Sequence, residues 1–284
     1  MYVLCSPCIL NPSLRAKGIT RPSDLELFER AKERCHVFGI EMVPLPCPET
    51  LYLGSDREPG TFLERLNTPE FASLLDEITE EVNDQIKKRG EPLCIIGVNS
   101  SPTCGITSTY FGSEGDEPPK RAGRGVFLSR FSRINAIDVG DFACYRIYLA
   151  APLFSESERT YNSSIALSLR EQFLLVHLPQ ELGDSYAGRD EDAHTRIFEE
   201  NLRALHEADI VVAIIDGADA DSGTAWEMGY ARALGKKIIA LRTDFRQVGS
   251  HEHVNLMLEQ SSTVVTSCEH LIRTLPFSIG RSKP

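Results

Sequence analysis

The chain alternates between short apolar runs and longer segments in which apolar residues recur every three or four positions. The clearest run, IVVAII at 210–215, is typical of a strand buried on both faces of a parallel sheet. The segment 70–88 has the period of an amphipathic helix, with Phe71, Leu74, Leu75, Ile78, Val82 and Ile86 on one face. This alternation predicts an α/β protein.

The first part of the chain predicts three strands separated by helices. The expected elements are strands at 2–5, 41–45 and 93–98 and helices at 22–38 and 70–88. Ser23 is expected to cap the first helix and Gly39 to end it. The other expectations are an irregular segment at 51–68, a loop or lid at 107–123 and a helix at 126–137.

A second α/β series is expected after a boundary at 139–143, which gives domains of 1–140 and 141–284. Its strands are expected at 145–150, 173–178, 210–215, 237–241 and 263–266. Its helices are expected at 156–172, 195–208, 223–234, 254–260 and 269–274. About five strands alternating with helices predict a doubly wound, flavodoxin-like parallel sheet.

Composition narrows the class of protein. The 284 residues are 42% hydrophobic and 25% charged, which suits one or two globular domains. The net charge of −11 argues against nucleic acids or anionic membranes as partners. The chain has no apolar run near the roughly 18 residues of a membrane span, and its first residues do not resemble a signal peptide. Eight cysteines without an export signal predict a reduced, cytoplasmic compartment.

Three acids follow the apolar run at 210–215, namely Asp216, Asp219 and Asp221, and Glu227 follows near the start of the next helix. Ligands of open α/β sheets bind where strands end and helices begin, so these carboxylates are candidates for chemistry on a polar ligand. The alternative is a solvated acidic loop in which Ser222 caps the helix and Asp216 forms a turn.

Three segments of the second half resemble the nucleoside 2-deoxyribosyltransferase family: IYLAAPLF (147–154), FEENLRALHEADIVVAIID (198–216) and DSGTAWEMGYARALGKKIIALRTDFR (221–246). The resemblance covers nearly all of 145–275. It implies cleavage or transfer at the N-glycosidic bond of a (deoxy)nucleoside or nucleotide. In that chemistry a carboxylate traps the positive charge that builds at C1′, as in retaining glycosidases.

Matching positions imply the roles of single residues. Glu227 matches the family nucleophile, which the helix N-terminus is expected to keep ionised. Asp221 matches the acid that holds the sugar or helps to protonate the base, and Tyr148 matches the tyrosine beside the nucleophile. Asn201 stands where the transferases often carry Asp. An amide binds a base but gives up no proton, so hydrolysis, another substrate and protonation by Asp221 stay open.

Other positions imply contacts with substrate, namely Asp216, Gln180, Gly223 and Asn255. Asn255 resembles a family segment that reaches a neighbouring protomer's site, which implies a homo-oligomer. From the residues alone, Tyr148 is equally well a packing residue and Asn255 a helix cap.

Each expected strand of the first half is followed by a cysteine: Cys8, Cys47 and Cys104. The carboxyl ends of parallel strands share one edge, so these cysteines are expected to converge. The segments CSPCILNPSLRAKG (5–18), PLPCPE (44–49) and GVNSSPTCGI (97–106) resemble the 2-thiouracil desulfidase family over roughly 1–140.

That resemblance implies a [4Fe-4S] cluster held by the three cysteines, with one iron open to sulfur from a thiolated base. Structural zinc is the alternative. Glu49 and Ser101 are candidate acid/base or base-binding groups. Arg15 matches a family arginine, whereas Lys17 stands where an acid is common. Cys5 is either a fourth ligand or a buried strand thiol.

The sequence therefore predicts a two-part nucleobase enzyme that acts on a small molecule. The rival interpretations are a glycosyl hydrolase or transferase with a purely structural metal module, and a non-enzymatic nucleotide or redox sensor. Two groups of residues are expected to have no chemical role. They are the core thiols Cys35, Cys94, Cys144 and Cys268, and the surface or core histidines His177, His194, His206, His251 and His253.

Overall fold

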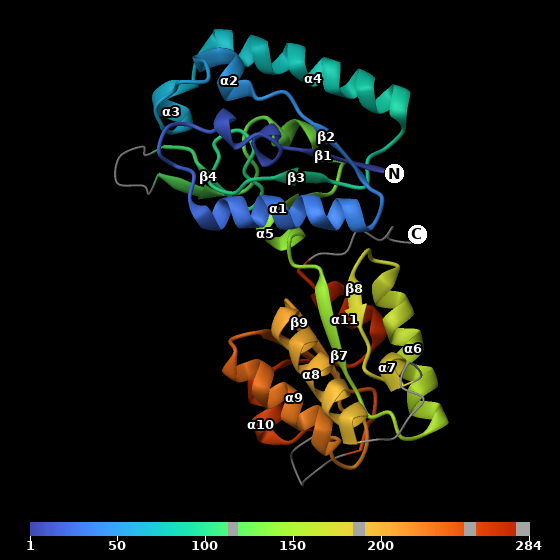
Figure 1. The fold of residues 1–284 in the computed structure, drawn as a ribbon. Coiled ribbons are helices and arrows are strands. Elements are labelled where there is room, and N and C mark those ends of the chain that lie inside the picture. Colours follow the sequence, from blue (N-terminus) through green and yellow to red (C-terminus); the bar gives the residue numbers. More distant parts are fainter. Residues whose placement is uncertain (113–118, 184–190, 247–253, 277–284) are drawn as a thin grey trace. The chain divides into compact units, whose positions relative to one another are not determined.

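The computed structural model describes residues 1–112, 119–183, 191–246 and 254–276. The chain divides into two compact units, Met1–Ala143 and Cys144–Pro284. Each unit combines helices with a parallel sheet, so the predicted α/β class is confirmed (Figure 1). The boundary expected between residues 140 and 141 falls inside the short helix α5 (Val139–Phe142).

The first unit is built on a parallel sheet whose strand order, within the described residues, is β2–β1–β3–β6. Its strands are β1 (Tyr2–Cys5), β2 (Glu41–Pro44), β3 (Ile95–Gly97) and β6 (Ala136–Asp138). Leu4 of β1 pairs with Val43 on one side and with Ile95 on the other. The strands are parallel, so the segments that follow β1, β2 and β3 emerge at the same edge.

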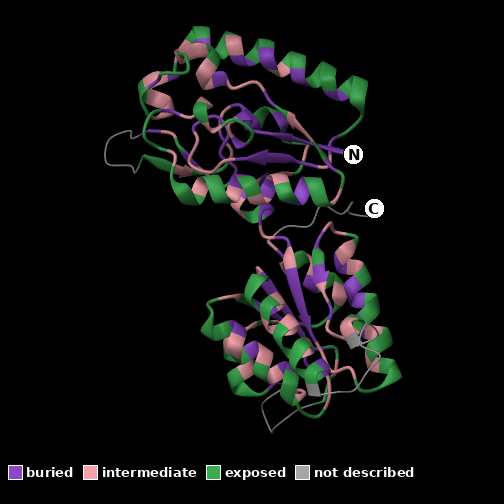
Figure 2. Cartoon of the chain, in the orientation of Figure 1, coloured by how far each residue is buried: buried purple, intermediate pink, exposed green. Residues whose placement is uncertain are grey.

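Helices cover both faces of this sheet (Figure 1). One face carries α4 (Pro69–Arg89), α2 (Pro48–Leu53) and α3 (Phe62–Arg65), and the other carries α1 (Pro22–Val37) and α5. The main core lies under α4, whose apolar stripe packs on Tyr2, Leu4 and Ile95. Figure 2 shows buried strands and exposed outer helix surfaces, the expected result of amphipathic helices on a sheet.

The helices of the first unit differ from the prediction in two places. The N-cap of α1 is Arg21 and not Ser23, because Pro22 takes the first helical position that its fixed backbone angle favours. The segment 51–68, expected to be irregular, contains the end of α2 and the whole of α3. A capping box between Thr61 and Glu64 starts α3, a local signal that outweighs the weak apolar period.

The region after β3 also differs from the prediction. The expected loop at 107–123 contains an antiparallel pair, β4 (Ser108–Tyr110) and β5 (Lys120–Ala122), while 113–118 lie outside the described residues. The helix expected at 126–137 is wrong, because a 3-10 turn η3 (Leu128–Phe131) leads into β6. Arg124 donates to the carbonyls of Phe131 and Ile134, which a continuing helix would use itself.

The second unit has a parallel sheet with the order β11–β10–β9–β7–β8 in the part of the chain that is described. The strands are β7 (Arg146–Ala150), β8 (Leu175–His177), β9 (Ile210–Ile214), β10 (Lys237–Leu241) and β11 (Thr263–Val265). Counted along the unit, this is the order 2-1-3-4-5 of flavodoxin-like folds, and the prediction is confirmed. The order reverses between β7 and β9, where such folds bind ligands.

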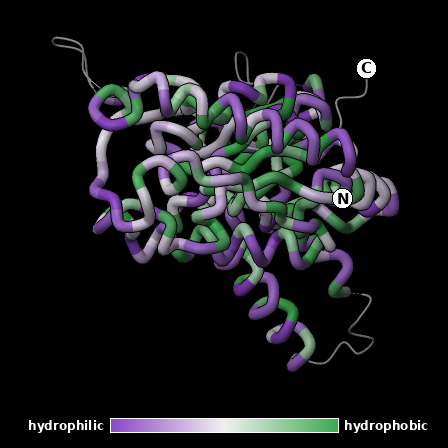
Figure 3. Tube along the Cα trace, turned by 90° about the horizontal axis from the view of Figure 1, so that it is seen from above, coloured by the Kyte–Doolittle hydropathy of each residue, from purple (hydrophilic) through white to green (hydrophobic). Residues whose placement is uncertain are grey.

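Helices α8 (Glu191–Glu207), α9 (Ser222–Ala233) and α10 (Leu256–Ser261) cover one face of this sheet, and α6 (Glu156–Arg170) and α11 (Cys268–Thr274) cover the other (Figure 1). The short helix α7 (Gln180–Gly183) was not expected. Hydrophobic and hydrophilic residues alternate along the helices, as amphipathic packing requires (Figure 3). Among the described helices, none is long and apolar enough to span a lipid bilayer.

Asp209 anchors the start of the central strand β7. Its Oδ2 accepts hydrogen bonds from the backbone N–H groups of Tyr145 and Arg146, each at 2.9 Å. The backbone N–H of Asp209 in turn donates to the carbonyl of Arg146 at 2.8 Å. One carboxylate therefore fixes where β7 begins relative to β9.

We expect Asp209→Ala to lower the free energy of unfolding of the second unit by about 1–3 kcal/mol, because two strand N–H groups lose their acceptor. Trp226 is the only tryptophan of the chain, so its fluorescence in a urea titration reports this unit. Glu269→Ala, which removes an exposed pair with Arg273, is the matched control and should change stability by less than about 1 kcal/mol. Equal losses in the two variants would contradict the assignment.

Candidate active site

A hydrogen bond between two side chains forms the centre of the site in the second unit. The hydroxyl of Tyr148 on β7 donates to Glu227 Oε1 on α9 at 2.5 Å. Tyr148 is completely buried, and it shares with Ala150 the face of the sheet that packs against α8 and α9. The strand period of two therefore aims the tyrosine at the helix that carries the carboxylate.

A cavity of about 160 Å³ lies beside this pair. It is lined by Tyr148, Phe198, Asn201, Leu202, Leu205, Gly223, Trp226 and Glu227. Four of the residues predicted from the sequence thus meet there, two from helix α9, one from α8 and one from β7. Ligand sites usually measure about 300–1,000 Å³, so a ligand of ordinary size would extend beyond this lining.

The wall opposite the sheet is aromatic. The ring of Trp226 stacks on that of Tyr230, with centroids 5.1 Å apart and planes at 6°, and Phe198 lies 6.3 Å from Trp226. Trp226 remains 51% exposed. Flat apolar rings beside a carboxylate suit a ligand with both a planar and a polar part.

Burial raises the pKa of Glu227 to about 7; the hydrogen bond from Tyr148 opposes this rise and the charge of Asp221 adds to it. The expectation that the helix N-terminus keeps Glu227 ionised is therefore wrong. Glu227 is the sixth residue of α9, beyond the first turn in which the helix dipole acts, so burial dominates. Both protonation states of Glu227 are populated near pH 7.

Burial and the neighbouring Glu227 also raise the pKa of Tyr148, which keeps its hydroxyl protonated as a donor.

Asp221 is the N-cap of α9, and its Oδ2 accepts from the backbone N–H of Thr224 at 3.0 Å. Ser222 opens the helix without capping it. Asp216 joins the ends of β9 and β10, because it accepts from the backbone N–H groups of Thr243 and Asp244 at 2.6 and 2.8 Å. The carboxylate of Asp216 is therefore engaged by backbone N–H groups, which agrees with a structural role at the end of the strand.

Two more of the predicted substrate residues are held by neighbouring backbone or side chains. Gln180 accepts from Asn162 at 3.0 Å and donates to the carbonyl of Arg159 and the hydroxyl of Ser163, each at 2.9 Å. Asn255 caps α10 by accepting from the backbone N–H of Met257 at 3.0 Å. The described lining of the cavity includes neither of them.

His177, which was expected to have no chemical role, lies against this site. Its Nε2 is 2.9 Å from Asn201 Oδ1, and its ring stacks on Tyr148 with centroids 5.3 Å apart and planes at 19°. His177 pairs with Tyr148 in the register of β7 and β8. This register is apparent only once β7 and β8 are known to be neighbours, so spacing along the sequence could not identify His177.

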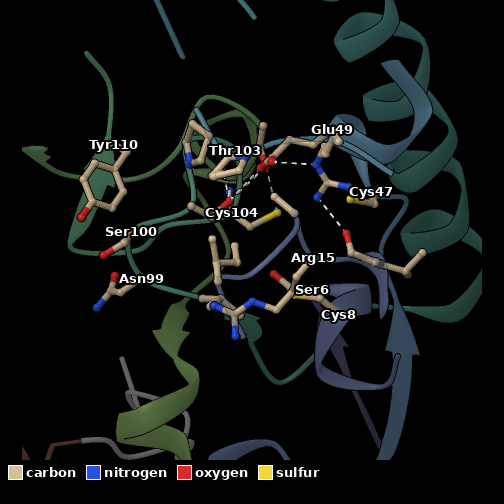
Figure 4. A pocket seen from close by; sticks show the side chains of 18 of the residues that line it. Ser6, Cys8, Arg15, Cys47, Glu49, Asn99, Ser100, Thr103, Cys104 and Tyr110 are labelled. Carbon is tan, nitrogen blue, oxygen red and sulfur yellow. Dashed lines mark hydrogen bonds and ion pairs between the residues drawn. The ribbon is translucent and has the colours of Figure 1, made fainter. Parts of the chain in front are cut away.

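The first unit contains a larger cavity, of about 670 Å³, at the edge where β1, β2 and β3 end. Cys8, Cys47 and Cys104 all line it, together with Glu49 and Ser101 (Figure 4). Cys8 comes from the turn η1 (Pro7–Ile9), Cys47 directly precedes α2, and Cys104 follows β3. The parallel sheet thus brings together residues from three distant parts of the sequence.

The arrangement of these thiols bears on which metal fits. In the described residues, no group of three or more His, Cys, Asp or Glu side chains is placed to hold a single metal ion. A zinc ion needs its thiolates within about 2.3 Å of one point. In an iron-sulfur cluster each thiolate binds its own iron, so the ligands lie farther apart. Cys8, Cys47 and Cys104 line one cavity, so they share a space in which each could hold a different iron of one cluster.

The carboxylate of Glu49 is oriented by three donors. Its Oε1 accepts from Ser101 Oγ at 3.1 Å and from Thr103 Oγ1 at 2.8 Å, and its Oε2 accepts from Arg57 Nε at 3.3 Å (Figure 4). Arg57 is buried and also donates to Thr50 Oγ1 at 3.0 Å. Sequence reasoning missed Arg57 and Thr50, which lie outside the segments with family motifs, and Thr103, which lies inside the segment 97–106.

Other residues of this region have clear partners. Cys5 is fully buried, points its thiol to the carbonyl of Val43 at 3.7 Å, and is not part of the described cavity lining. This favours the buried strand thiol over a fourth ligand. Arg15 pairs with Asp24 at 2.7 Å on the cavity wall. The eight cysteines all lie in the described residues, and none forms a disulfide.

Comparison with known proteins identifies a family domain in the second unit. Residues 147–266 match the family model of the nucleoside 2-deoxyribosyltransferases. An uncharacterized protein of Methanocaldococcus jannaschii is 37% identical over 160 residues, which are 55% of this chain and 87% of that protein.

Among solved structures, a 2-deoxyribosyltransferase from Bacillus psychrosaccharolyticus is 28% identical, with a TM-score of 0.41, over 46% of this chain and 96% of its own. A [4Fe-4S]-dependent thiouracil desulfidase is 18% identical, with a TM-score of 0.33, over 48% of this chain and 89% of its own.

The chain belongs to the family of its archaeal relative, and its second unit carries a nucleoside 2-deoxyribosyltransferase domain. The resemblance of the C-terminal half that the sequence motifs predicted is confirmed.

The titration of Glu227 gives a prediction that does not depend on activity. With 13C-labelled glutamate, the carboxyl signal of Glu227 should titrate with a midpoint near pH 7. In Tyr148→Phe the midpoint should move to higher pH, because the variant loses the hydrogen bond that favours the carboxylate. Tyr161→Phe, on α6, is the control and should leave the midpoint unchanged. A wild-type midpoint close to that of an exposed glutamate would contradict the burial argument.

Proposed function

We propose that the second unit breaks the N-glycosidic bond of a (deoxy)nucleoside or nucleotide with Glu227 as the nucleophile. The observation that carries the proposal is the Tyr148–Glu227 hydrogen bond on the wall of the cavity. A carboxylate held by a tyrosine in an apolar cavity is the group that a retaining mechanism requires.

In the first step the carboxylate oxygen of Glu227 bonds to C1′ while the C1′–N bond breaks, and the bonding electron pair goes to the base nitrogen. In the second step water or another base attacks C1′, and the carboxylate of Glu227 leaves. The acceptor gives up one proton, and the departing base gains one, so the reaction balances. Tyr148 keeps one carboxylate oxygen in place throughout.

Asp221 and Asn201 support the neighbouring parts of the substrate. Asp221 is close enough to Glu227 for its charge to raise the pKa of that carboxyl group, which suits a residue that holds sugar hydroxyls. Asn201 lines the cavity beside Glu227 and offers an amide to the base.

A nucleotide sensor would not need a buried carboxyl group with a raised pKa, because that group costs stability whenever it is ionised. This favours an enzyme.

We further propose that Cys8, Cys47 and Cys104 hold a [4Fe-4S] cluster in the first unit and that this unit desulfurates thiolated bases. When bound, such a cluster offers an open iron that accepts sulfur. Glu49 would position the base or move a proton, because Ser101, Thr103 and Arg57 fix its carboxylate. The cavity of about 670 Å³ lies within the usual range for small ligands.

A homo-oligomer is the third part of the proposal. Beside Asn255 the helix α10 exposes Leu256 and Met257, at 55% and 74% of their surfaces. Adjacent exposed apolar side chains lose unfavourable contact with water when a second copy covers them. Their place next to Asn255 supports an approach of this segment to another copy.

Glu227→Gln should lower base release from a panel of nucleosides and deoxynucleosides by on the order of 10³-fold or more, because the amide cannot trap the C1′ charge. Chromatography of free base measures the rate. Glu171→Gln, at the exposed C-terminal end of α6, is the matched control and should keep the wild-type rate. Wild-type turnover by Glu227→Gln would refute the covalent mechanism.

Cys47→Ala should abolish the broad visible absorption of anaerobically purified protein and most of its iron and acid-labile sulfide, because one iron loses its ligand. Iron and sulfide analysis of the whole chain measures this. Cys268→Ala, in α11 of the second unit, is the control and should retain both. Stoichiometric zinc in the wild-type protein, without iron, would instead support a structural metal module.

A further inference from the structure

We propose that His177 is a positioning residue: it fixes the amide of Asn201 so that the N–H groups of Asn201 face the ligand, and thereby selects bases with a hydrogen-bond acceptor at that point. The inference rests on the proposed cleavage of an N-glycosidic bond and deepens it. It assigns a role to a side chain that matches no motif of the sequence.

His177 is held in a fixed orientation by two contacts. Its ring lies almost parallel to that of Tyr148, at 19°, with centroids 5.3 Å apart. Its Nε2 lies 2.9 Å from Asn201 Oδ1. The stack on a completely buried ring restricts rotation of the imidazole, so the hydrogen bond to Asn201 has one geometry.

This hydrogen bond decides which end of the amide is free. The amide oxygen of Asn201 only accepts, so His177 must donate through Nε2–H. Asn201 lines the cavity, and its Nδ2 group is left to interact with the ligand there. Without a fixed donor on Oδ1, an asparagine can turn either end of its amide toward a ligand.

The consequence for the reaction is electrostatic. When the C1′–N bond breaks, negative charge grows on the departing base. An N–H group directed at an acceptor atom of the base stabilises that charge, and one such donor typically contributes about 10²–10³-fold in rate. An aspartate at this position would donate only when protonated, whereas an amide donates at every pH. The preferred base therefore carries a carbonyl oxygen or an unprotonated ring nitrogen where Asn201 reaches it.

The tautomer of His177 tests the inference without any substrate. Two-bond 1H–15N spectra of the whole labelled protein above pH 7.5 should show His177 with a protonated Nε2 and an unprotonated Nδ1. In His177→Phe, which keeps a stacking ring but no donor, the Asn201 amide protons should exchange faster with water. A protonated Nδ1 with a bare Nε2 would overturn the inference, whatever the activity of the enzyme.

Kinetics provide the second test, with 2′-deoxyadenosine and 2′-deoxyuridine beside deaza and deoxo analogues that each lack one acceptor. Removing the acceptor that Asn201 contacts should lower wild-type kcat/KM by about 10²–10³-fold. His177→Phe should lose most of this discrimination, and His177→Gln, whose amide N–H also donates, should restore it. His206→Phe is the control, because His206 also contacts a tyrosine, Tyr230, which lies outside the described cavity lining.

The outcomes separate the two levels of the proposal. Base release by the wild type with unchanged discrimination in His177→Phe would overturn the role of His177 and leave Glu227 catalysis intact. The Nε2–H tautomer in a protein that releases no base would overturn the proposed cleavage and keep the assigned hydrogen bond. Trp226 fluorescence in a urea titration identifies any variant that fails to fold.

Discussion

The arrangement of the second unit depends on the burial of one carboxyl group. Glu227 is removed from water and hydrogen-bonded to Tyr148, itself completely buried. Moving a carboxylate out of water is costly, and a single hydrogen bond compensates only part of that cost. Burial therefore raises the pKa of Glu227 to about 7 despite this hydrogen bond. Strand β7, which carries Tyr148, is anchored at its start by Asp209 and packed between β8 and β9, so the partner of Glu227 is held in place.

Both units use the same geometric device. A parallel sheet delivers the ends of several strands to one edge, so short loops from distant parts of the sequence meet there. In the first unit this brings together three thiols and a carboxylate. In the second, the loop after β9 leads into helix α9, which places Glu227 against Tyr148 in the middle of β7. The units have separate cores, so each edge is shaped by its own sheet.

The alternation of apolar runs and amphipathic segments was sufficient to predict the second sheet and three strands of the first, because burial on two faces leaves few polar residues in a strand. Strand β6 of the first sheet was not predicted. The failures have local causes. A helix was expected at 126–137, but Arg124 takes up the carbonyl groups of that turn. The ionisation of Glu227 was misjudged because helix position was weighed and burial was not. His177 was missed because strand register, which places it beside Tyr148, becomes visible only when the sheet order is known.

Trp226 has a use that follows from its place on the cavity wall. It is the sole indole of the chain, it stacks on Tyr230, and half of its surface is open to solvent. A planar ligand entering the cavity displaces water from this ring and changes its emission, while the first unit contributes no tryptophan signal. The second unit thus contains an intrinsic optical probe, with which stopped-flow mixing can time the arrival of a ligand separately from any bond cleavage.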